Sequence, residues 1–562
     1  MSFYLPSGFK VENAEQLIAL YKTLLAQPIN TEPELRSFLK NVSDLESAVS
    51  EDMAWRYIRM TCDTSNKAHN DAYEEFVTKI QPKIAPFDNE INKKIVESPV
   101  AASSMTSPED AIYLRTLKSA VDIFRDENIE LNAKLATLAQ EYGSIQGGMS
   151  VNLEGKELTM QQAGNYLLKT DRNMRKTAWE SITAERLKAT NRLEDIMNEM
   201  VQLRHQVAIN AGFANFRDYM FQAMCRFDYT VQDCLDFHKS VRDNVVPVVK
   251  KLTEQRKEQM GIDNLMPWDT SVHPQGLEPL KPFNGEKDLT DNTIKCFADL
   301  DSYFGQCIQT MQTEKLLDLE SRKGKAPGGY NYPLAQTNMP FIFMNATGNM
   351  RDLETMVHEG GHAIHSFLMA PLALNAYKNT PSEVAELASM SMELLSMDGW
   401  KYFFNDPTEL KRARQEQLQG IPGTLCWIAQ VDSFQHWMYE NPSHTAQQRA
   451  KKWLELGTEY GTGMVDYSQH MDALTYSWHR QLHIFEVPFY YIEYGFAQLG
   501  SLGVWNNYLK NGPQAIEQYK DALKLGYTRS IPQIYETAGA KFDFSANYIN
   551  GLMKQIEKEL GL

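Results

Sequence analysis

Residues 350–369 read MRDLETMVHEGGHAIHSFLM. At about 100° per residue, His358, His362 and His365 fall within one sector of a helix. Apolar residues recur at three- and four-residue steps and cluster on the other side, namely Leu353, Met356, Val357, Ile364, Phe367 and Leu368. The segment therefore predicts a helix with one core stripe and a separate histidine face.

The histidine face contains an H-E-x-x-H motif, residues 358–362. Histidines four positions apart on a helix lie about 6 Å from each other, which suits two ligands of a tetrahedral zinc ion. Glu359, between them, is placed to act as a general base toward water. Gly360 and Gly361 each cost the helix about 1 kcal/mol relative to alanine, so we expect another backbone or a substrate to approach closely there. The alternative is a histidine-bearing surface helix that binds no metal.

A catalytic zinc ion takes a third protein ligand. Residues 380–383 (TPSE) predict the start of the next helix, with Glu383 as the carboxylate of a capping box. Glu386 lies in the second turn, 24 residues after His362. The residues alone favour Glu386 over its acidic neighbours as the third ligand. Glu393, two turns further on, is a candidate for supporting a ligand from behind.

A histidine- and tyrosine-rich segment lies near the C-terminus, where residues 478–500 read WHRQLHIFEVPFYYIEYGFAQLG. Pro488 predicts the end of one helix and the start of another, because proline cannot occupy a helix interior without loss of a hydrogen bond. Donors on both sides of this break could stabilise the oxyanion of a tetrahedral intermediate. The alternative is an aromatic core cluster with a satisfied histidine. The candidates are His483, Tyr490, Tyr491 and Tyr494.

The composition excludes several classes of protein. With 562 residues the chain is too long for one hydrophobic core, since single domains rarely exceed about 250–300 residues. Its 43% hydrophobic and 23% charged residues are typical of a globular protein. The net charge of −16 argues against binding of nucleic acid, which needs a basic surface. No apolar run in the sequence approaches the roughly 18 residues of a membrane span.

The cysteines and the N-terminal residues predict a cytoplasmic protein. Six cysteines are scattered along the chain without a C-x-x-C pair, which favours free thiols in a reducing compartment over disulfides or a thiolate zinc site. The first residues, MSFYLPSGFKVENAEQ, lack the basic and apolar regions of a secretory signal.

Most of the chain is predicted to be helical. Residues 144–158 instead predict a short hairpin with its turn at Glu154-Gly155, and residues 340–344 (PFIFM) predict a strand. A domain boundary is expected near residue 200. Amphipathic periodicity predicts helices over residues 13–27, 33–49, 70–96, 109–141, 175–210, 231–260 and 291–316.

The motifs resemble those of a known family. H-E-x-G-H, followed by E-x-x-S at residues 386–389, is similar to the thimet oligopeptidase and oligoendopeptidase F family of zinc metallopeptidases. Gly360 departs from the pattern, because many members carry a bulkier apolar residue there. Further segments resemble the same family: KAPGGY (325–330), PFIFMN (340–345), the hairpin, the DR-x-x-R stretch (171–175) and residues 478–500.

The resemblance implies a fold and a division of the chain. The fold is mainly α, with two helical lobes around a deep central substrate channel and a few short β-strands near the zinc helix. Residues 1–200 are then an N-terminal helical lobe that includes the hairpin and covers the channel. Residues 201–562 are the zinc metallopeptidase catalytic domain.

The resemblance also implies roles for the candidate residues. One Zn²⁺ per chain is held by His358, His362 and Glu386, which matches the third ligand of the family, and Glu359 is the general base. It gives His483 and one or two of the three tyrosines a role at the oxyanion, without deciding which tyrosine.

Together these observations predict a zinc-dependent endopeptidase that hydrolyses internal bonds of short peptides, with no nucleic acid and no membrane as partner. The strand at 341–345 is expected to offer an open edge to the substrate backbone. A zinc carboxypeptidase or dipeptidyl carboxypeptidase is the alternative; it needs a cation for the terminal carboxylate, and Arg480 is a candidate. A non-catalytic peptide-binding protein is a further alternative, against which the intact Glu359 argues.

Overall fold

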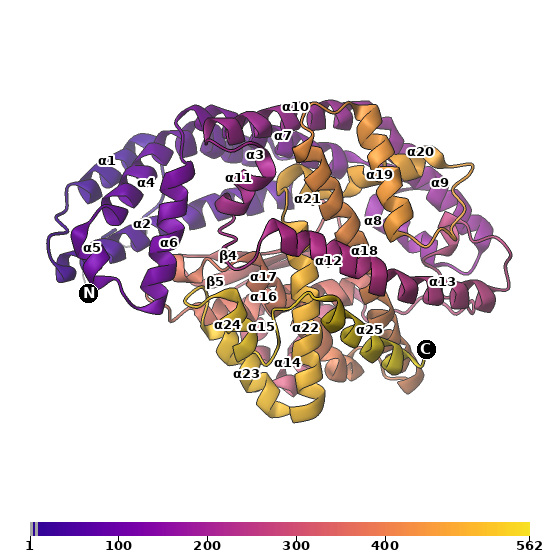
Figure 1. Ribbon diagram of the computed structural model, residues 1–562. Coiled ribbons are helices and arrows are strands. Elements are labelled where there is room, and N and C mark those ends of the chain that lie inside the picture. Colours follow the sequence, from indigo (N-terminus) through magenta and orange to yellow (C-terminus); the bar gives the residue numbers. More distant parts are fainter. Residues whose placement is uncertain (1–3, 6–8) are drawn as a thin grey trace.

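Helices make up most of the chain in the computed structural model, which describes residues 4, 5 and 9–562. In Figure 1 the first helices, in indigo, lie at one end of the molecule, and the last ones, in yellow, lie in its lower part. Only a few short strands lie between the described helices. The prediction of a mainly helical fold is confirmed.

The helices of the first part of the chain are α1 (Ala14–Leu25), α2 (Glu32–Cys62), α3 (Lys67–Glu75), α4 (Gln81–Val96), α5 (Pro99–Ser104), α6 (Pro108–Ile123), α7 (Glu127–Gly148), α8 (Met160–Gly164), α9 (Arg172–Lys188) and α10 (Thr190–Asn210). The middle part contains α11 (Phe216–Ala223), α12 (Val231–Asn244), α13 (Val246–Met260), α14 (Gly285–Leu300), α15 (Ser302–Thr313), α16 (Met350–Met369), α17 (Ser382–Leu395) and α18 (Pro407–Glu440).

The last part contains α19 (Ala446–Tyr460), α20 (Met471–Thr475), α21 (Leu482–Glu486), α22 (Tyr491–Asn511), α23 (Pro513–Lys524), α24 (Ile531–Thr537) and α25 (Ala546–Leu560). Short π or 3₁₀ segments connect several of these helices: η1 (Phe76–Ile80), η2 (Asn165–Leu168), η3 (Pro267–Asp269), η4 (Asn375–Lys378), η5 (Ser396–Tyr402) and η6 (Ser477–Arg480).

Five predicted helices are divided in the structure, namely residues 70–96, 109–141, 175–210, 231–260 and 291–316, and the cause is clear for the last two. Residues 231–260 form α12 and α13, because Pro247 has no N–H for the preceding turn and fits only near a helix start. Residues 291–316 are divided at Asp301, whose backbone is extended and whose side chain accepts a hydrogen bond from Tyr303 N as the cap of α15. Local caps and prolines thus override a continuous apolar period.

The predicted hairpin is confirmed. Strands β1 (Ser150–Leu153) and β2 (Lys156–Thr159) pair antiparallel, with Leu153 opposite Lys156. Glu154 and Gly155 between them both have positive φ, 52° and 77°, which is the backbone of the two-residue turn that matches the twist of paired strands.

A three-stranded sheet lies beside α16. Its strands are β3 (Leu317–Glu320), β4 (Tyr330–Leu334) and β5 (Met339–Ala346), in the order β3-β5-β4. Strand β5 is central, parallel to β3 and antiparallel to β4. The prediction that residues 341–345 offer an open edge is therefore wrong. The apolar run itself explains why β5 is central. Its five consecutive buried residues, 340–344, need neighbouring elements on all sides. The free edge near α16 belongs to β4, whose Pro333 is typical of an edge strand.

Two large hydrophobic clusters organise the helices. One is built from α1, α2, α4 and α6 together with Leu374 and Tyr377, and the other extends from Ala54 to Ile556 and includes α16, α17, α18 and α22. The expected domain boundary near residue 200 stays a prediction. Helix α10 runs through this position without a break, and its residues Met197, Met200 and Val201 are fully or almost fully buried.

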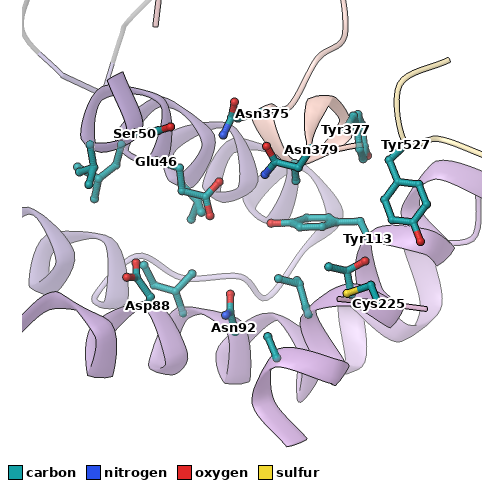
Figure 2. A pocket seen from close by; sticks show the side chains of 18 of the residues that line it. Glu46, Ser50, Asp88, Asn92, Tyr113, Cys225, Asn375, Tyr377, Asn379 and Tyr527 are labelled. Carbon is teal, nitrogen blue, oxygen red and sulfur yellow. The ribbon is translucent and has the colours of Figure 1, made fainter. Parts of the chain in front are cut away.

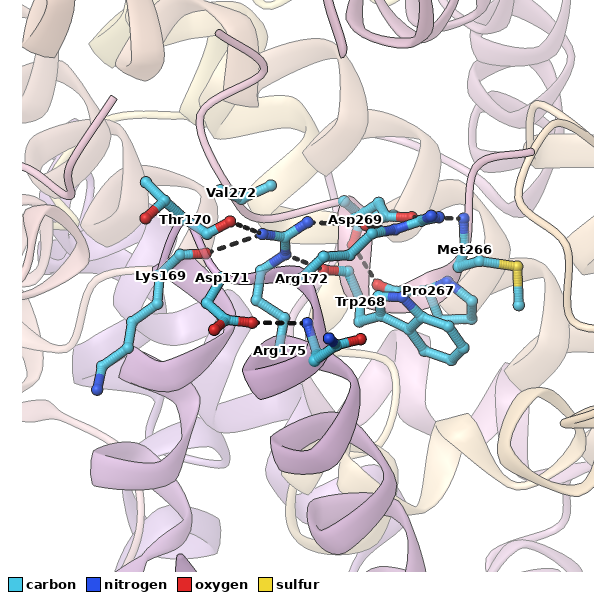
Figure 3. A network of polar contacts seen from close by, with 12 residues as sticks. Lys169, Thr170, Asp171, Arg172, Arg175, Met266, Pro267, Trp268, Asp269 and Val272 are labelled. Atoms are coloured by element: carbon cyan, nitrogen blue, oxygen red, sulfur yellow. Dashed lines mark hydrogen bonds and ion pairs between the residues drawn. The ribbon is translucent and has the colours of Figure 1, made fainter. Parts of the chain in front are cut away.

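The DR-x-x-R stretch (171–175) binds the irregular segment that contains η3 and precedes α14 (Figure 3). Asp269 is fully buried and pairs with Arg172 at 2.7 Å and with Arg175 at 2.9 Å. Its second carboxylate oxygen also accepts from Met266 N at 3.1 Å. Arg175 is itself buried and donates to three backbone carbonyls, those of Trp268, Lys169 and Thr170. One carboxylate thus pairs with two guanidinium groups and joins α9 to η3.

We expect Asp269→Ala to destabilise the protein by about 3–5 kcal/mol, because it leaves the buried Arg175 guanidinium without a counter-charge. The measurement is urea denaturation followed by circular dichroism. The control is Asp263→Ala, an exposed aspartate of the same segment, for which we expect a change within about 0.5 kcal/mol. Equal effects of the two substitutions would contradict the importance of this network.

Candidate active site

The two glycines of the H-E-x-x-H motif lie where α16 meets other elements. A Cβ on Gly361 would lie 2.7 Å from Ser389 Cα and 2.8 Å from Ala388 O, both on α17. A Cβ on Gly360 would lie 2.7 Å from the Phe297 ring. The expected close approach of another backbone is confirmed at Gly361. Gly360 is explained by the bulky aromatic ring that occupies the space a larger side chain would need.

The close packing of α16 and α17 brings three candidate metal ligands together. Ligand atoms of His358, His362 and Glu386 lie within 4.8 Å of one another. Glu386 Oε2 is 3.3 Å from His358 Nε2 and 3.5 Å from His362 Nε2. Burial raises the pKa of Glu386, but the two imidazoles outweigh this and hold it well below its usual range. The carboxylate is thus ionised, and all three groups can act as ligands of a divalent cation.

Residues behind the ligands fix their orientation. His358 Nδ1–H donates to Glu393 Oε1 at 2.7 Å, so Nε2 presents its lone pair to the ligand cluster. Gln417 on α18 donates to the other Glu393 oxygen at 2.8 Å. The Tyr490 hydroxyl donates to Glu386 Oε1 at 2.6 Å, which leaves Oε2 facing the histidines. The predicted supporting position of Glu393 is therefore seen in the structure.

Glu359 lies beside the cluster and is 6% exposed. It lines a cavity of about 450 Å³ together with His358, His483, Tyr491 and Tyr494. Burial is the largest influence on Glu359 and raises its pKa, whereas the two neighbouring histidines oppose the shift. A buried carboxylate with a raised pKa is a stronger proton acceptor than an exposed one, as a general base requires.

The predicted break at Pro488 is confirmed, since α21 ends at Glu486 and α22 begins at Tyr491. His483 and Tyr494 meet across it, with His483 Nε2 3.1 Å from the Tyr494 hydroxyl. Gln481 donates to His483 Nδ1 at 2.7 Å, so the ring proton is on Nε2 and faces the cavity side. Burial lowers the pKa of His483 to about 4, so the ring is neutral at pH 7.

The sequence and the fold of this chain are similar to those of known proteins. The model of peptidase family M3 matches residues 165–554. The chain belongs to peptidase family M3. The model of the M3 N-terminal domain matches residues 8–108 of the same chain.

Curated relatives of this M3 peptidase are bacterial oligopeptidases. Oligopeptidase PepF of Bacillus subtilis is 23% identical over 72% of this chain, and an oligoendopeptidase F homolog of Borreliella burgdorferi is 20% identical over 93% of it and 90% of its own length. The alignments with PepF and with group B oligopeptidase PepB of Streptococcus agalactiae span only 59% and 52% of those proteins. Among solved structures, Pz peptidase A with an inhibitor matches at a TM-score of 0.94, 26% identity and 99% of both chains.

A structure described as a putative oligoendopeptidase F matches this M3 peptidase at a TM-score of 0.94 with 25% identity, covering 100% of this chain and 99% of that one. The helical fold with few short strands near α16 is therefore shared with oligoendopeptidase structures over the whole chain. No helix in the described part of the chain has both the length and the apolar character that a bilayer span needs.

One expected role in the M3 peptidase site is wrong. Glu383 does not cap α17; it is 2% exposed and accepts a hydrogen bond from the Tyr229 hydroxyl at 2.5 Å. The reason is that α17 begins inside the protein, where Tyr229 and the buried Arg226 supply a better partner than the helix end. His365 shares the helix sector of the ligands but is 2% exposed and lies outside the ligand cluster.

A second group of possible ligands in the M3 peptidase lies away from the H-E-x-x-H motif. Cys234, Asp432 and His436 lie close together and are buried. Asp432 Oδ2 is 2.8 Å from His238 Nε2 and 3.2 Å from His436 Nε2. Asp432 is thus hydrogen-bonded to His238, whereas the ring nitrogens of His436 have no hydrogen-bond partner among the described residues.

Other residues of the site lack any local signal in the sequence. Three such residues lie near the ligands. Gln417 on α18 bonds Glu393, 24 residues earlier in the chain, Gln481 bonds His483, and Arg351 lines the cavity of Glu359. Each is a single polar residue in an ordinary helical or loop segment. Their roles depend on contacts between elements that the spacing of motifs does not predict.

We expect Glu393→Ala to weaken binding of a divalent metal about 10–100-fold, because His358 loses the acceptor that orients its ring. The measurement is the dissociation constant for Zn²⁺ in competition with a chelator. Glu393→Gln, which keeps an acceptor, should lose less affinity. Glu409→Gln, an exposed residue near the start of α18, is the control. Unchanged affinity in Glu393→Ala would contradict the orienting role.

Proposed function

We propose that this M3 peptidase is a cytoplasmic, zinc-dependent endopeptidase that hydrolyses internal bonds of short peptides. The observation that carries the proposal is the convergence of His358, His362 and Glu386 beside the buried carboxylate of Glu359, at the wall of a cavity. The relatives named oligopeptidase and oligoendopeptidase support short peptides as substrates and internal bonds as targets.

The donor set fits one zinc ion per chain. Ligand atoms at 2.0–2.2 Å from a tetrahedral ion lie about 3.3–3.6 Å from each other, and Glu386 Oε2 lies 3.3 and 3.5 Å from the two histidine nitrogens. Two imidazoles and one carboxylate are a ligand set of hydrolytic zinc sites, with one position left open for water or substrate. When bound, the ion supplies Lewis-acid polarisation of the scissile carbonyl and lowers the pKa of water.

Glu359 is the proton carrier of the proposed reaction. Its carboxylate accepts a proton from the attacking water as the new C–O bond forms. It then delivers this proton to the nitrogen of the leaving amine as the C–N bond breaks. One group can serve both steps because the proton that the water loses is the one that the amine gains.

His483 and Tyr494 are proposed to stabilise the oxyanion. Both line the cavity, and the His483 proton on Nε2 and the Tyr494 hydroxyl are donors. Tyr491 also lines the cavity and is the remaining candidate donor. Tyr490 acts differently in this proposal, because its hydroxyl donates to Glu386 and so positions a ligand.

The free edge of β4 is the proposed binding site for the substrate backbone. The Asn331 backbone N–H lies close to Glu359, and a Cβ on Gly329 would be 3.7 Å from its carboxylate. An extended peptide can add to this edge through main-chain hydrogen bonds. Residues 1–200 are proposed to form the lobe that covers the channel, and residues 201–562 the catalytic domain.

The carboxypeptidase alternative has less support. Arg480 lines a different cavity and lies over the Trp427 ring, 5.1 Å from its centroid. Arg351 lines the cavity of Glu359 but pairs with Glu354 at 3.1 Å. A non-catalytic peptide-binding protein would have no need of a general base at Glu359.

We expect Glu359→Gln to lower kcat/KM by at least about 10³-fold while Zn²⁺ stays bound, because the proton acceptor is lost and the ligands are kept. The assay follows an internally quenched peptide that is acetylated and amidated at its ends, with products identified by mass spectrometry and zinc measured by elemental analysis. Internal cleavage of the blocked peptide supports the endopeptidase. Full activity of Glu359→Gln, or activity only on a free C-terminus, would contradict the proposal.

We expect Tyr494→Phe and His483→Gln each to lower kcat about 10²–10³-fold with a smaller change in KM, because a donor to an oxyanion acts in the transition state. Stopped assays over a range of substrate concentrations separate kcat from KM. Tyr508→Phe, an aromatic residue further along α22 whose hydroxyl bonds Asp398, is the control. A pure KM effect would indicate a binding role instead.

A further inference from the structure

A second and larger cavity, of about 750 Å³, lies between the N-terminal helices and the start of α17. Its walls come from α2, α4 and α6, and Figure 2 shows polar side chains that face the space between them. The segment before α17, the end of α11 and Glu493 of α22 also contribute to the lining. None of the described lining residues is a lysine, an arginine or a histidine. Carboxylates, amides and hydroxyls are thus the polar groups of this cavity.

Two carboxylates of the cavity have no cationic partner. Glu46 on α2 and Asp88 on α4 form no ion pair with any residue in the described part of the chain, and the Tyr21 hydroxyl lies beside Asp88. Glu493, by contrast, pairs with Arg226 at 2.8 Å. Burial raises the pKa of Glu46 to about 8 and that of Asp88 to about 6. Burial thus disfavours the charged form of both groups, and Glu46 keeps its proton at pH 7 unless a cation beside it offsets this cost.

An independent group points into the same space. Tyr113 on α6 is 7% exposed, and its hydroxyl has no hydrogen-bond partner among the residues that the structure describes. In Figure 2 its ring extends into the cavity, with the hydroxyl on the side of Glu46 and Asp88. Buried hydroxyl groups are nearly always hydrogen-bonded. A free hydroxyl oriented toward the side of Glu46 can accept a hydrogen bond from an N–H group of a ligand.

The cavity adjoins the proposed active site. Ser382 lines it, and Glu386 lies four residues later on α17, which is about 6 Å along the helix axis. The free edge of β4 leads in the same direction: Asn331 lies close to Glu359, and the Tyr332 hydroxyl is 3.9 Å from the sulfur of Met53, which lines the cavity. Met53 thus contacts β4 on one side and lines this cavity on the other.

We propose that this cavity binds a cationic group of the peptide substrate, an ammonium or a guanidinium, with Glu46 and Asp88 as its counter-charges and the Tyr113 hydroxyl as a further acceptor. The inference rests on the peptidase function proposed above and adds a substrate class to it. Peptides with a positive charge a few residues from the scissile bond are preferred. The charge comes from a lysine or arginine side chain or from the amino terminus, since all three present N–H donors to carboxylates.

The test uses internally quenched peptides that differ only in replacement of lysine by norleucine at successive positions around the scissile bond, each with a free and with an acetylated amino terminus. For wild type we expect kcat/KM to be at least about tenfold higher for the peptide with lysine at one particular position, or with a free amino terminus, than for its norleucine or acetylated counterpart. The difference should arise mainly from KM. The double variant Glu46→Gln/Asp88→Asn should lose this preference and hydrolyse the norleucine peptide as wild type does. The lysine series and the acetylated series separate the two sources of charge.

Matched controls keep the test decisive. Glu97→Gln, an exposed glutamate at the end of α4, should keep the preference, and Tyr113→Phe should lose part of it. Binding of the same peptides to Glu359→Gln protein, measured by fluorescence anisotropy, reports on the cavity without hydrolysis. If no peptide is cleaved by wild type, the proposed function fails, and the binding ratio still decides the cation site. Equal binding of lysine and norleucine peptides, or a preference that survives the double variant, overturns the inference.

Discussion

The close contact between α16 and α17 is the constraint on which the site depends. A glycine at 361 lets the two backbones approach until a Cβ would clash with Ser389 Cα. At a normal distance of 8–10 Å between helix axes with larger side chains, Glu386 would be held further from His358 and His362. The roughly 1 kcal/mol of helix propensity lost at each glycine is therefore the cost of a ligand set drawn from two helices. The sheet and α18 then lock the other sides of these helices, through β5 against α16 and Gln417 against Glu393.

Buried charge is handled differently in different parts of the molecule. Around Asp269, one buried carboxylate pairs with two arginines and holds the irregular segment in place. At the ligand cluster, His358 and His362 lie against Glu386, and His358 also bonds Glu393. The atoms that face one another there are all possible ligands of a divalent cation. At Glu46 and Asp88, two acidic groups are left without a cationic partner among the described residues. The structural carboxylate thus has cationic partners within the protein, whereas Glu46 and Asp88 have none among the described residues.

The sequence predicted the parts of this protein that depend on neighbours along the chain. The five-residue H-E-x-x-H motif was enough to identify His358, Glu359 and His362, because histidines at i and i+4 of a helix share a face without any tertiary contact. The hairpin and the break at Pro488 were predicted for similar local reasons. The burial of Glu383 could not be predicted, since its partner Tyr229 lies more than 150 residues away in the chain. The central position of β5 and the cavity of Glu46 could not be predicted for the same reason. Each depends on which elements pack together, and the contributing helices have ordinary amphipathic patterns.

The free edge of β4 has a consequence for which molecules can be cut. A strand edge offers N–H and C=O groups, and only a chain whose own backbone groups are unsatisfied can use them. In a folded protein more than nine-tenths of the buried backbone groups are already paired, so a stretch within a sheet or helix would first have to unravel. An unstructured peptide meets this edge without that penalty. In the proposed binding mode, selection against native proteins is therefore chemical, and it acts on the peptide bond itself, whatever side chains flank it.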